Sequence, residues 1–454
     1  MNLPDSSNTW RNLRYGGAGF ALGLPTIPLL VHLPALYAEH IGLGLTATGL
    51  ALFVARLFDI VTDPLIGVAA NVSSPQKNPL RCKKTLILIG GLIGAVGILF
   101  LLNPSPGASW LYLAFWSSVL YLGWTMINIP YMTWGAELSN SYKGRTRVTA
   151  TREGFTLAGI IVAGAVPALA AIGGYNQAQA VSVTGWLVVG IGIILFAILL
   201  KGVDEPTVTP TKNSEPLKTA LRGISTNGPF QNLIACWFIN GMANGIPAVL
   251  FLLYMKHVLK MNELERGVLT FIYFFVGICG LAIWSRLSDR LGKHKCWSLA
   301  MVIACLAFAA VPFLDEGDFI PFLIITVITG LTLGADLAIP PSMQADVAEH
   351  EHLRSGHNHT ALMFALWSMV TKTALALSVL IAFPLLEASG FSTDSDQTEN
   401  NTRALAVIYS LVPVVLKLLA IGIVWRHPLT AEKQFGNRRR LVEFQNRLQR
   451  QDPK

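Results

Sequence analysis

A short charged string, RLFDIVTDP, interrupts an otherwise apolar stretch that runs from about residue 44 to residue 70. Its charged members, Arg56, Asp59 and Asp63, are three and four residues apart, so a helix places them on one face. A charge at the centre of a membrane-spanning helix costs about 2.5–3.5 kcal/mol even on insertion-based scales, and it rarely persists without a task. A self-contained Arg–Asp pair would only pin helices together, whereas two acids against one arginine leave net negative charge. The string therefore predicts a cation site.

The composition places this stretch in a membrane protein. Only 13% of the residues are charged, against about 25% in ordinary soluble proteins, and the mean hydropathy is +0.52. Runs long enough to cross a bilayer recur at about 16–39, 44–70, 85–102, 109–135, 150–174, 183–200, 230–256, 265–286, 296–314, 319–341, 360–386 and 403–425. We therefore expect an all-α membrane protein with twelve transmembrane helices in two six-helix bundles, and no removable signal peptide.

The net charge of +8 does not indicate a nucleic-acid partner, because its placement follows the membrane. Basic residues gather in alternate connections, at 77–84, 143–147, 212–222 and 290–295, and in the tail from residue 438. Such an excess is typical of the cytoplasmic side. We predict a multi-pass plasma-membrane protein with both termini in the cytoplasm, able to work as a monomer. The five cysteines form no CxxC pair, so neither a disulfide framework nor a zinc site is expected.

Internal echoes predict two related halves. A polar segment rich in Pro, Thr and Ser separates them, which gives an N-terminal bundle at 1–200, a cytoplasmic linker at 201–229, a C-terminal bundle at 230–426 and a basic tail at 427–454. The fourth span of each half is followed by an acid and, eight residues later, an arginine: Glu137 with Arg145, and Asp346 with Arg354. The first span of each half contains Gly and Pro, and interrupted helices in matching positions point to a transporter's central site. Ordinary kinks are the alternative interpretation.

The connection after the eighth predicted span reads SRLSDRLGKHK. It resembles the G-x-x-x-D-R-x-G-R-R loop of the major facilitator superfamily, with Asp289 and Arg290 matching. Charged loops at the rim of a bundle can form ion pairs that hold one face shut and break when it opens. We predict that a cytoplasmic gate contains Asp289, Arg290, Glu137, Arg145, Asp346 and Arg354.

Five motifs carry a closer resemblance: VARLFDIVTDPLIG, NIPYMTWGAEL, TRVTATREGF, QADVAEHEHLRSG and VTKTALA. With them the chain resembles the glycoside–pentoside–hexuronide:cation symporter family, to which melibiose permease belongs. The resemblance implies cation-coupled transport of a small organic solute by alternating access. It implies that Asp59, Asp63 and Thr125 hold the cation, with Thr62 where melibiose permease has an asparagine.

The resemblance also implies solute contacts, with departures. Arg152 matches a basic residue near the substrate, whereas Gly23 and Asn128 stand where melibiose permease has acids that grip sugar hydroxyls. A melibiose-like galactoside is therefore disfavoured. The family also carries hexuronides, sulfonated sugars and lysolipids, and the positive balance from Arg152 and Lys372 favours an anionic or amphiphilic solute.

Lys372 is the single charge in the eleventh predicted span and lies far from both of its ends. Snorkelling is difficult there, so a partner is expected. We hypothesise that Lys372 neutralises Asp59 or Asp63 until a cation displaces it. Sodium suits the hydroxyl and carboxylate oxygens, and a proton would exploit repulsion between the carboxylates. Both remain open.

Other features have plainer alternatives. Trp124 and Asn244 would line a cavity or serve interfacial and interhelical roles equally well. The histidines of EHEHLRSGHNH could bind a metal, but a cytoplasmic loop is the simpler interpretation. Asp336 and Lys417 are further intramembrane charges, for which packing is the default. No P-loop, nucleophile elbow or zinc motif is found, so we expect no enzyme and no cofactor, although a membrane-embedded lipid enzyme or a non-transporting sensor remains an alternative.

Overall fold

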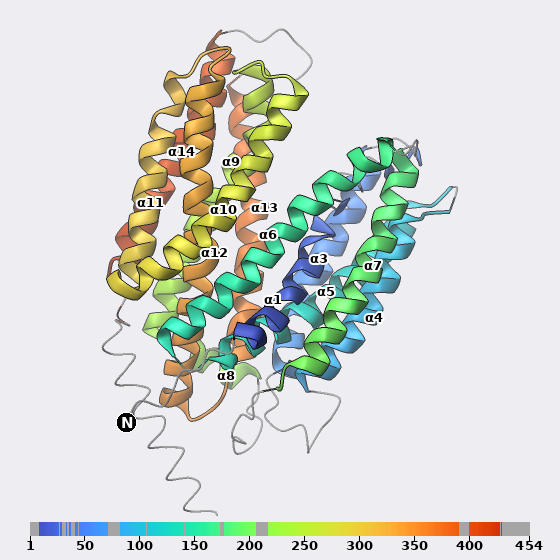
Figure 1. Cartoon of the computed structure of the whole chain (residues 1–454), viewed down its shortest axis with the longest axis vertical. Helices are drawn as coiled ribbons and strands as arrows, with labels where there is room; N and C mark the ends of the chain where they lie inside the picture. Colours follow the sequence, from blue (N-terminus) through green and yellow to red (C-terminus); the bar gives the residue numbers. More distant parts are fainter. Residues whose placement is uncertain are drawn as a thin grey trace, which may run out of the picture. The chain divides into compact units, whose positions relative to one another are not determined.

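The computed structural model describes residues 9–26, 28–29, 33, 36–37, 41–43, 45–70, 82–105, 107–139, 141–172, 177–205, 217–389, 399–426 and 428. These residues form helices joined by short connections (Figure 1). The helices are α1 (Thr9–Gly23), α3 (Leu45–Ala70), α4 (Lys83–Leu102), α5 (Trp110–Leu138), α6 (Tyr142–Ile172), α7 (Gln177–Gly202), α8 (Leu217–Ser225), α9 (Gly228–His257), α10 (Glu263–Leu291), α11 (Lys293–Ala309), η4 (Val311–Phe313), α12 (Phe319–Ser355), α13 (Thr360–Ala388) and α14 (Glu399–Val424). The predicted first span lies partly outside the described residues, and so does the predicted tail.

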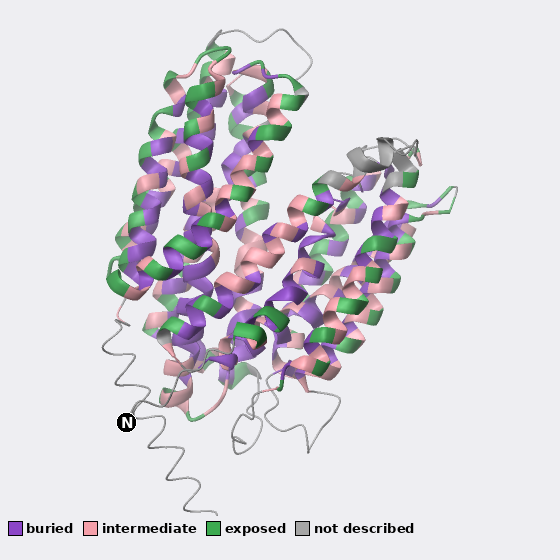
Figure 2. Ribbon diagram, viewed as in Figure 1, coloured by how far each residue is buried: buried purple, intermediate pink, exposed green. Residues whose placement is uncertain are grey.

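The outer surfaces of these helices are apolar. Leu92, Ile193 and Leu306 are each at least 64% exposed, and Figure 2 shows exposed and buried residues alternating along most helices. Soluble proteins rarely expose contiguous apolar patches of this kind. Within the described part of the chain, 9 helices are long and apolar enough to cross a membrane. The expectation of an all-α, multi-pass membrane protein is therefore confirmed.

The chain divides into two compact units. Unit 1 comprises the described residues up to Leu221 together with Ala348–Leu366, and unit 2 comprises Arg222–Val347 and the described residues from Trp367 onward. Residues 348–366, which follow the tenth predicted span, belong to the unit built from the N-terminal helices, and the predicted linker 201–229 is divided between the two units.

Unit 1 is organised around α5. Helix α5 packs against α3 and α4, and α1 packs against α6 and α7. A reciprocal pair of hydrogen bonds joins α1 to α5: the Tyr15 hydroxyl donates to the carbonyl of Tyr131 at 2.8 Å, and the Tyr131 hydroxyl donates to the carbonyl of Tyr15 at 2.7 Å. Both rings are fully buried, with centroids 4.6 Å apart. This clasp helps hold the central helix in place.

Glycines allow α1 and α6 to approach closely. A Cβ atom on Gly159 would lie 2.3 Å from the carbonyl oxygen of Phe20, and one on Gly23 would lie 2.1 Å from that of Thr156. Helix α1 ends at Gly23, in the region where Gly and Pro predict an interruption. In unit 2, by contrast, α9 continues as one helix through Pro247. Its Gly245 instead admits Ser378 of α13, whose hydroxyl oxygen would lie 2.3 Å from an added Cβ.

Unit 2 has its core around α9, α11 and α14, which pack together, with α14 contacting both of the others. The rings of Tyr254 and Tyr409 stack with centroids 4.5 Å apart, and Phe322 packs against the same cluster. Asn262 begins α10 with a capping box, in which its side chain and that of Glu265 each bind the other's backbone N–H. In the core of unit 2, packed aromatic rings thus have the place that the hydrogen-bonded tyrosine pair has in unit 1.

The close approach of α1 and α6 gives a first prediction. Gly159→Ala should lower the free energy of unfolding by about 1–3 kcal/mol, because the methyl group must displace the α1 backbone. Its matched control is Gly164→Ala in the same helix, where nothing lies within 4 Å of an added Cβ. Thermal unfolding in detergent should show a lower melting temperature for the first variant alone. Equal melting temperatures for the two variants would contradict this packing.

Candidate cation and solute site

Helix α3 carries the predicted cation ligands on its buried side. Asp59 is 2% exposed and Asp63 is fully buried, and α3 packs against α5 along this side. Pro64 lies inside the helix directly after Asp63. Because proline has no N–H, Pro64 offers no hydrogen bond to the carbonyl of Ile60. Within one turn of the acids, this carbonyl oxygen therefore does not receive the usual hydrogen bond from the helix backbone.

Both carboxylates converge on one hydroxyl of α5. The Thr125 Oγ1 atom lies 3.0 Å from Asp59 Oδ1 and 2.9 Å from Asp63 Oδ1, and Thr125 is 1% exposed. A hydroxyl has a single proton to donate. It therefore donates to one carboxylate at a time. Three oxygen atoms of the kind that hard cations prefer thus lie close together.

Arg56 balances this charge from the edge of the site. Its Nη1 atom lies 3.5 Å from Asp59 Oδ2, but its side chain is 46% exposed. The guanidinium also sits 4.5 Å from the ring centroid of Tyr121. The three charged residues lie on one helix, α3, at the predicted spacing. The arginine, however, lies at the margin of the site, and the two acids lie inside it. A largely exposed ion pair at this distance contributes little to the free energy of folding.

Thr62 is turned toward its own helix. Its hydroxyl donates to the backbone carbonyl of Asp59 at 3.0 Å, the i−3 back-bonding that is common for threonine in helices. The hydroxyl oxygen keeps acceptor capacity, so its predicted role as a cation ligand stays a prediction. Thr125 is the residue of α5 whose hydroxyl contacts both Asp59 and Asp63.

The predicted solute residues of unit 1 lie on α1, α5 and α6. Trp124 and Asn128 are half-buried on α5, and Gly23 packs against α6. Arg152 is 6% exposed, and its Nε and Nη2 atoms bind Glu153 Oε1 at 2.9 and 2.5 Å. The adjacent glutamate therefore balances the arginine. This pair removes one of the two positive charges on which the expectation of an anionic solute rested.

Unit 2 holds the remaining solute residues and a cluster that sequence reasoning left unassigned. Lys372 is half-buried on α13, and Asn244 is half-buried on α9. Asn244 Nδ2 donates to Asp336 Oδ2 at 2.9 Å, and Lys417 Nζ lies 3.4 Å from the same oxygen. The two charges that were assigned to packing by default are thus an ion pair. The sequence offered one signal for this pair: an acid in one apolar span and a base in another.

Two of the predicted gate acids, Glu137 and Asp346, each form an ion pair with a lysine at the start of a helix. In unit 1, Lys83 at the first position of α4 binds Glu137 near the end of α5, with Nζ–Oε2 2.5 Å. In unit 2, Lys293 at the first position of α11 binds Asp346 of α12, with Nζ–Oδ2 2.6 Å. Sequence reasoning noted both lysines as part of the basic loops but did not assign them as partners. Their equivalent helix positions were the available signal.

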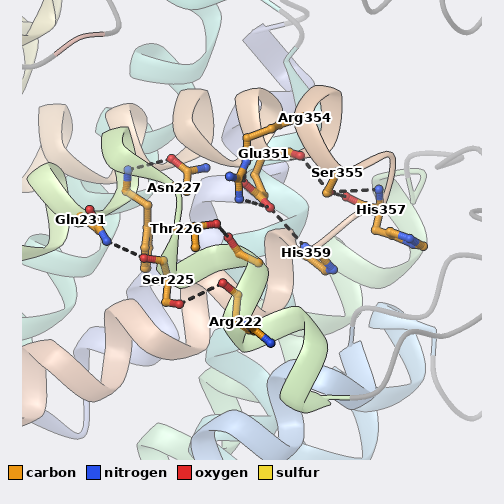
Figure 3. Close-up of polar contacts among 12 residues, drawn as sticks. Arg222, Ser225, Thr226, Asn227, Gln231, Glu351, Arg354, Ser355, His357 and His359 are labelled. Atoms are coloured by element: carbon orange, nitrogen blue, oxygen red, sulfur yellow. Dashed lines mark hydrogen bonds and ion pairs between the residues drawn. The ribbon is translucent and has the colours of Figure 1, made fainter.

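The predicted gate arginines Arg145 and Arg354 both lie in unit 1 and bind different acids. In unit 1, Arg145 of α6 binds Glu349 at 2.6 Å, with both side chains buried. Arg354 binds Glu351 at 3.0 Å, and His359 approaches the same carboxylate (Figure 3). The acid–arginine echo in the sequence therefore does not reflect one repeated contact.

The remaining predicted gate residues lie at the end of α10, and the histidines are candidate metal ligands from the sequence. Asp289 is half-buried and Arg290 is exposed at the end of α10. Among the described residues, no group of three or more His, Cys, Asp and Glu side chains is arranged to hold a metal ion. The predicted gate as a whole stays a prediction.

Comparison with known proteins identifies relatives along nearly the whole chain. Residues 14–431 match the family described as MFS/sugar transport protein. The human sodium-dependent lysophosphatidylcholine symporter 1 is 24% identical, with 88% of this chain and 79% of that protein covered. The Escherichia coli glucuronide carrier protein homolog is 24% identical over 94% and 93%. The Lactiplantibacillus pentosus isoprimeverose transporter is 22% identical over 88% and 85%.

Solved structures share the fold. A bacterial homologue of the iron transporter ferroportin, in an outward-facing state, superimposes with a TM-score of 0.64 at 16% identity, over 92% of this chain and 97% of that chain. The E. coli fucose:proton symporter superimposes with a TM-score of 0.63 at 11% identity, over 91% and 98%. The predicted major facilitator fold is therefore confirmed.

The buried lysines give a second prediction. Lys293→Met should lower the free energy of unfolding by about 3–5 kcal/mol, because it leaves Asp346 buried without its countercharge. Lys260→Met is the matched control in the same unit: its ion pair with Glu316 is exposed, and exposed pairs contribute about 0–1 kcal/mol. Melting temperatures in detergent check both. A Lys293→Met protein as stable as the control would refute the assigned pair.

Proposed function

The chain belongs to the MFS/sugar transport protein family, and from this premise we propose that Asp59, Asp63 and Thr125 hold the coupling cation of a symporter. The protein is a cation-coupled symporter of the major facilitator fold, and the human relative that matches most of its length is named a sodium-dependent symporter. The convergence of two buried carboxylates on one hydroxyl carries the proposal. Two acids held close together in an apolar bundle favour the binding of a small cation or the retention of a proton.

Sodium is the cation that this set of oxygens suits best. Carboxylate and hydroxyl oxygens are hard ligands, which favour ions such as Na⁺ over softer metals. Two relatives covering most of this chain, from human and zebrafish, are named sodium-dependent symporters. The likeness to the fucose:proton symporter is at 11% identity and concerns the fold. We therefore propose sodium, with Thr62 as a further ligand.

Coupling requires that cation and solute together favour the state closed over both. A ligand with equal affinity for two states shifts neither. We propose that Lys372 offsets the charge of Asp59 or Asp63 in the cation-free state, and that sodium replaces it. A membrane potential supplies roughly 2.3 kcal/mol per charge per 100 mV, and a tenfold sodium gradient adds about 1.4 kcal/mol. Together these support concentrative uptake of a neutral solute.

The solute proposed is a hydroxyl-rich sugar or glycoside. Gly23 and Asn128 are uncharged, and Arg152 is balanced by Glu153, so the predicted contacts in unit 1 suit a neutral molecule. Polar side chains and Trp124 would then contact the hydroxyl groups and the ring. A lysolipid is the second candidate, because the human lysophosphatidylcholine symporter covers 88% of this chain at the same identity as the glucuronide carrier homolog.

Opening and closing would use the rim ion pairs. We propose that Lys83–Glu137 and Lys293–Asp346 brace each unit at its cytoplasmic end, with Arg145, Arg354, Asp289 and Arg290 completing the gate. The basic residues in these connections support our proposal that this end, and both termini, lie in the cytoplasm of a plasma-membrane protein. The proposal includes no catalysed reaction and no cofactor, and a single chain forms the whole carrier.

The cation site gives a third prediction. Thr125→Val should raise the sodium concentration for half-maximal uptake at least about tenfold, since losing one ligand worth about 1.4 kcal/mol changes affinity by that factor. Thr133→Val is the matched control, a buried threonine of the same helix that donates to the carbonyl of Ile129. Asp63→Asn should abolish sodium stimulation. The measurement is uptake into proteoliposomes under an imposed sodium gradient.

A solute panel gives a fourth prediction and separates the candidates. Labelled isoprimeverose, glucuronate and lysophosphatidylcholine are offered with sodium, with lithium or with a proton gradient alone. We expect sodium-driven uptake of isoprimeverose to exceed that of the other two. Uptake driven equally by protons alone would argue against sodium, and Asp63→Asn transport that remains fully sodium-stimulated would sink the site assignment.

A further inference from the structure

A buried polar cluster in unit 2 surrounds the carboxylate of Asp336. Four nitrogen atoms approach it: Trp297 Nε1 at 2.6 Å, Asn240 Nδ2 at 3.3 Å, Asn244 Nδ2 at 2.9 Å and Lys417 Nζ at 3.4 Å. Asp336 is 8% exposed, while Lys417 is 4% exposed and Trp297 and Asn240 are fully buried. The cluster joins four helices of one unit, α9, α11, α12 and α14.

These four neighbours of the Asp336 carboxylate are hydrogen-bond donors. All four bring N–H groups to its oxygen atoms, so these oxygens act as acceptors. The neighbouring amides must therefore turn their NH₂ groups toward it, which removes the usual ambiguity in the orientation of an asparagine side chain.

Lys417 confirms this orientation independently at one of the two amides. Its Nζ atom donates to Asn240 Oδ1 at 2.9 Å, so both ends of the Asn240 amide are engaged. At Asn244 the NH₂ end is engaged by Asp336, and no hydrogen bond to its Oδ1 atom is found among the described residues. Asn244 is half-buried, unlike Asn240. Its carbonyl oxygen is therefore an oriented acceptor at the margin of the cluster.

A need for stability does not explain the ion pair. Replacing a buried ion pair by apolar residues is often neutral or stabilising, because desolvation offsets the attraction between the charges. Buried charged pairs are instead retained where they specify one arrangement of polar groups. In this cluster the arrangement specified is the direction of the Asn244 amide.

We propose that Asp336 and Lys417 are positioning residues that fix Asn244 Oδ1 as a hydrogen-bond acceptor for a hydroxyl group of the transported solute. This inference rests on the proposed function and extends it to unit 2. Its ligand is a solute that carries a hydroxyl donor. A site built to bind a hydroxyl rejects analogues that lack it far more strongly than an apolar pocket rejects an extra methylene, so Asn244 contributes to selectivity as well as to affinity.

The first test compares uptake kinetics of isoprimeverose, a probe rich in hydroxyl groups, in proteoliposomes. Asn244→Ala removes the acceptor, and the double variant Asp336→Asn/Lys417→Met keeps the cluster neutral. An amide at position 336 can donate as well as accept, so Asn244 is no longer held in one direction. We expect each change to raise KM at least about tenfold, or about 1.4 kcal/mol, with kcat little altered.

The triple variant decides whether the pair acts through Asn244. If it does, combining all three substitutions raises KM no further than Asn244→Ala alone. Loss of the pair and loss of Asn244 then remove the same contact with the solute, so their effects on KM are not additive. The matched control neutralises the exposed pair of the same unit, Lys260→Met/Glu316→Gln, and should keep the wild-type KM. A double variant with the wild-type KM, or a fully additive triple variant, would overturn the inference while leaving sodium-driven uptake intact.

A second measurement needs no transported solute. Asn244→Asp places a second carboxyl group beside Asp336 in place of an N–H donor, so the melting temperature in detergent should fall by several degrees. Asn244→Asp/Asp336→Asn restores the original charge and should recover most of that loss. An Asn244→Asp protein with the wild-type melting temperature would contradict the assigned geometry. A wild-type protein that takes up none of the three sodium-tested solutes would contradict the proposed function, and the proposed role of Asn244 with it.

Discussion

The contact of one hydroxyl with two buried carboxylates is the interaction on which the proposed cation site depends. Thr125 lies within 3.0 Å of Asp59 and Asp63, in surroundings with little water to stabilise a second negative charge. The helix that carries this hydroxyl packs closely against its neighbours. A Cβ on Gly123 of α5 would lie 2.4 Å from the backbone of Gly94 of α4, and the tyrosine clasp ties α5 to α1. This packing supports the arrangement in which we propose that a cation binds.

Other charges inside the units lie in close pairs of opposite sign. Lys83 with Glu137, Lys293 with Asp346 and Lys417 with Asp336 are all pairs between a basic and an acidic side chain. A neutral pair can brace helices or orient other groups, but it does not attract a further ion. Within the described part of the chain, this contrast with two acids that contact one hydroxyl supports the proposal that the cation binds at Asp59 and Asp63.

Several site features followed from the sequence, and others could not. Helical spacing predicted that Asp59 and Asp63 share a face, and family resemblance added Thr125, which lies 62 residues from Asp63. The resemblance also suggested a positive balance near Arg152, but the structure pairs this arginine with Glu153. Adjacent residues do not face each other on a helix, so this contact depends on the length and bending of both side chains. The Asp336–Lys417 pair spans 81 residues, a separation over which spacing has no predictive value.

The sequence by itself determined that this chain lies in a membrane, that its apolar helices belong to a major facilitator transporter, and that α3 carries more acid than base. The membrane location and the acidic excess follow from composition and local periodicity, which depend on residues close together in the chain, and the transporter family follows from the resemblance of short motifs. Only the tertiary structure decided which charges are neutralised: Arg56 is turned to the edge, Glu153 balances Arg152, and Asp336 orients Asn244. Electrostatic balance in a low-dielectric interior depends on distances of a few ångströms between separate helices, and such distances exist only once those helices have packed.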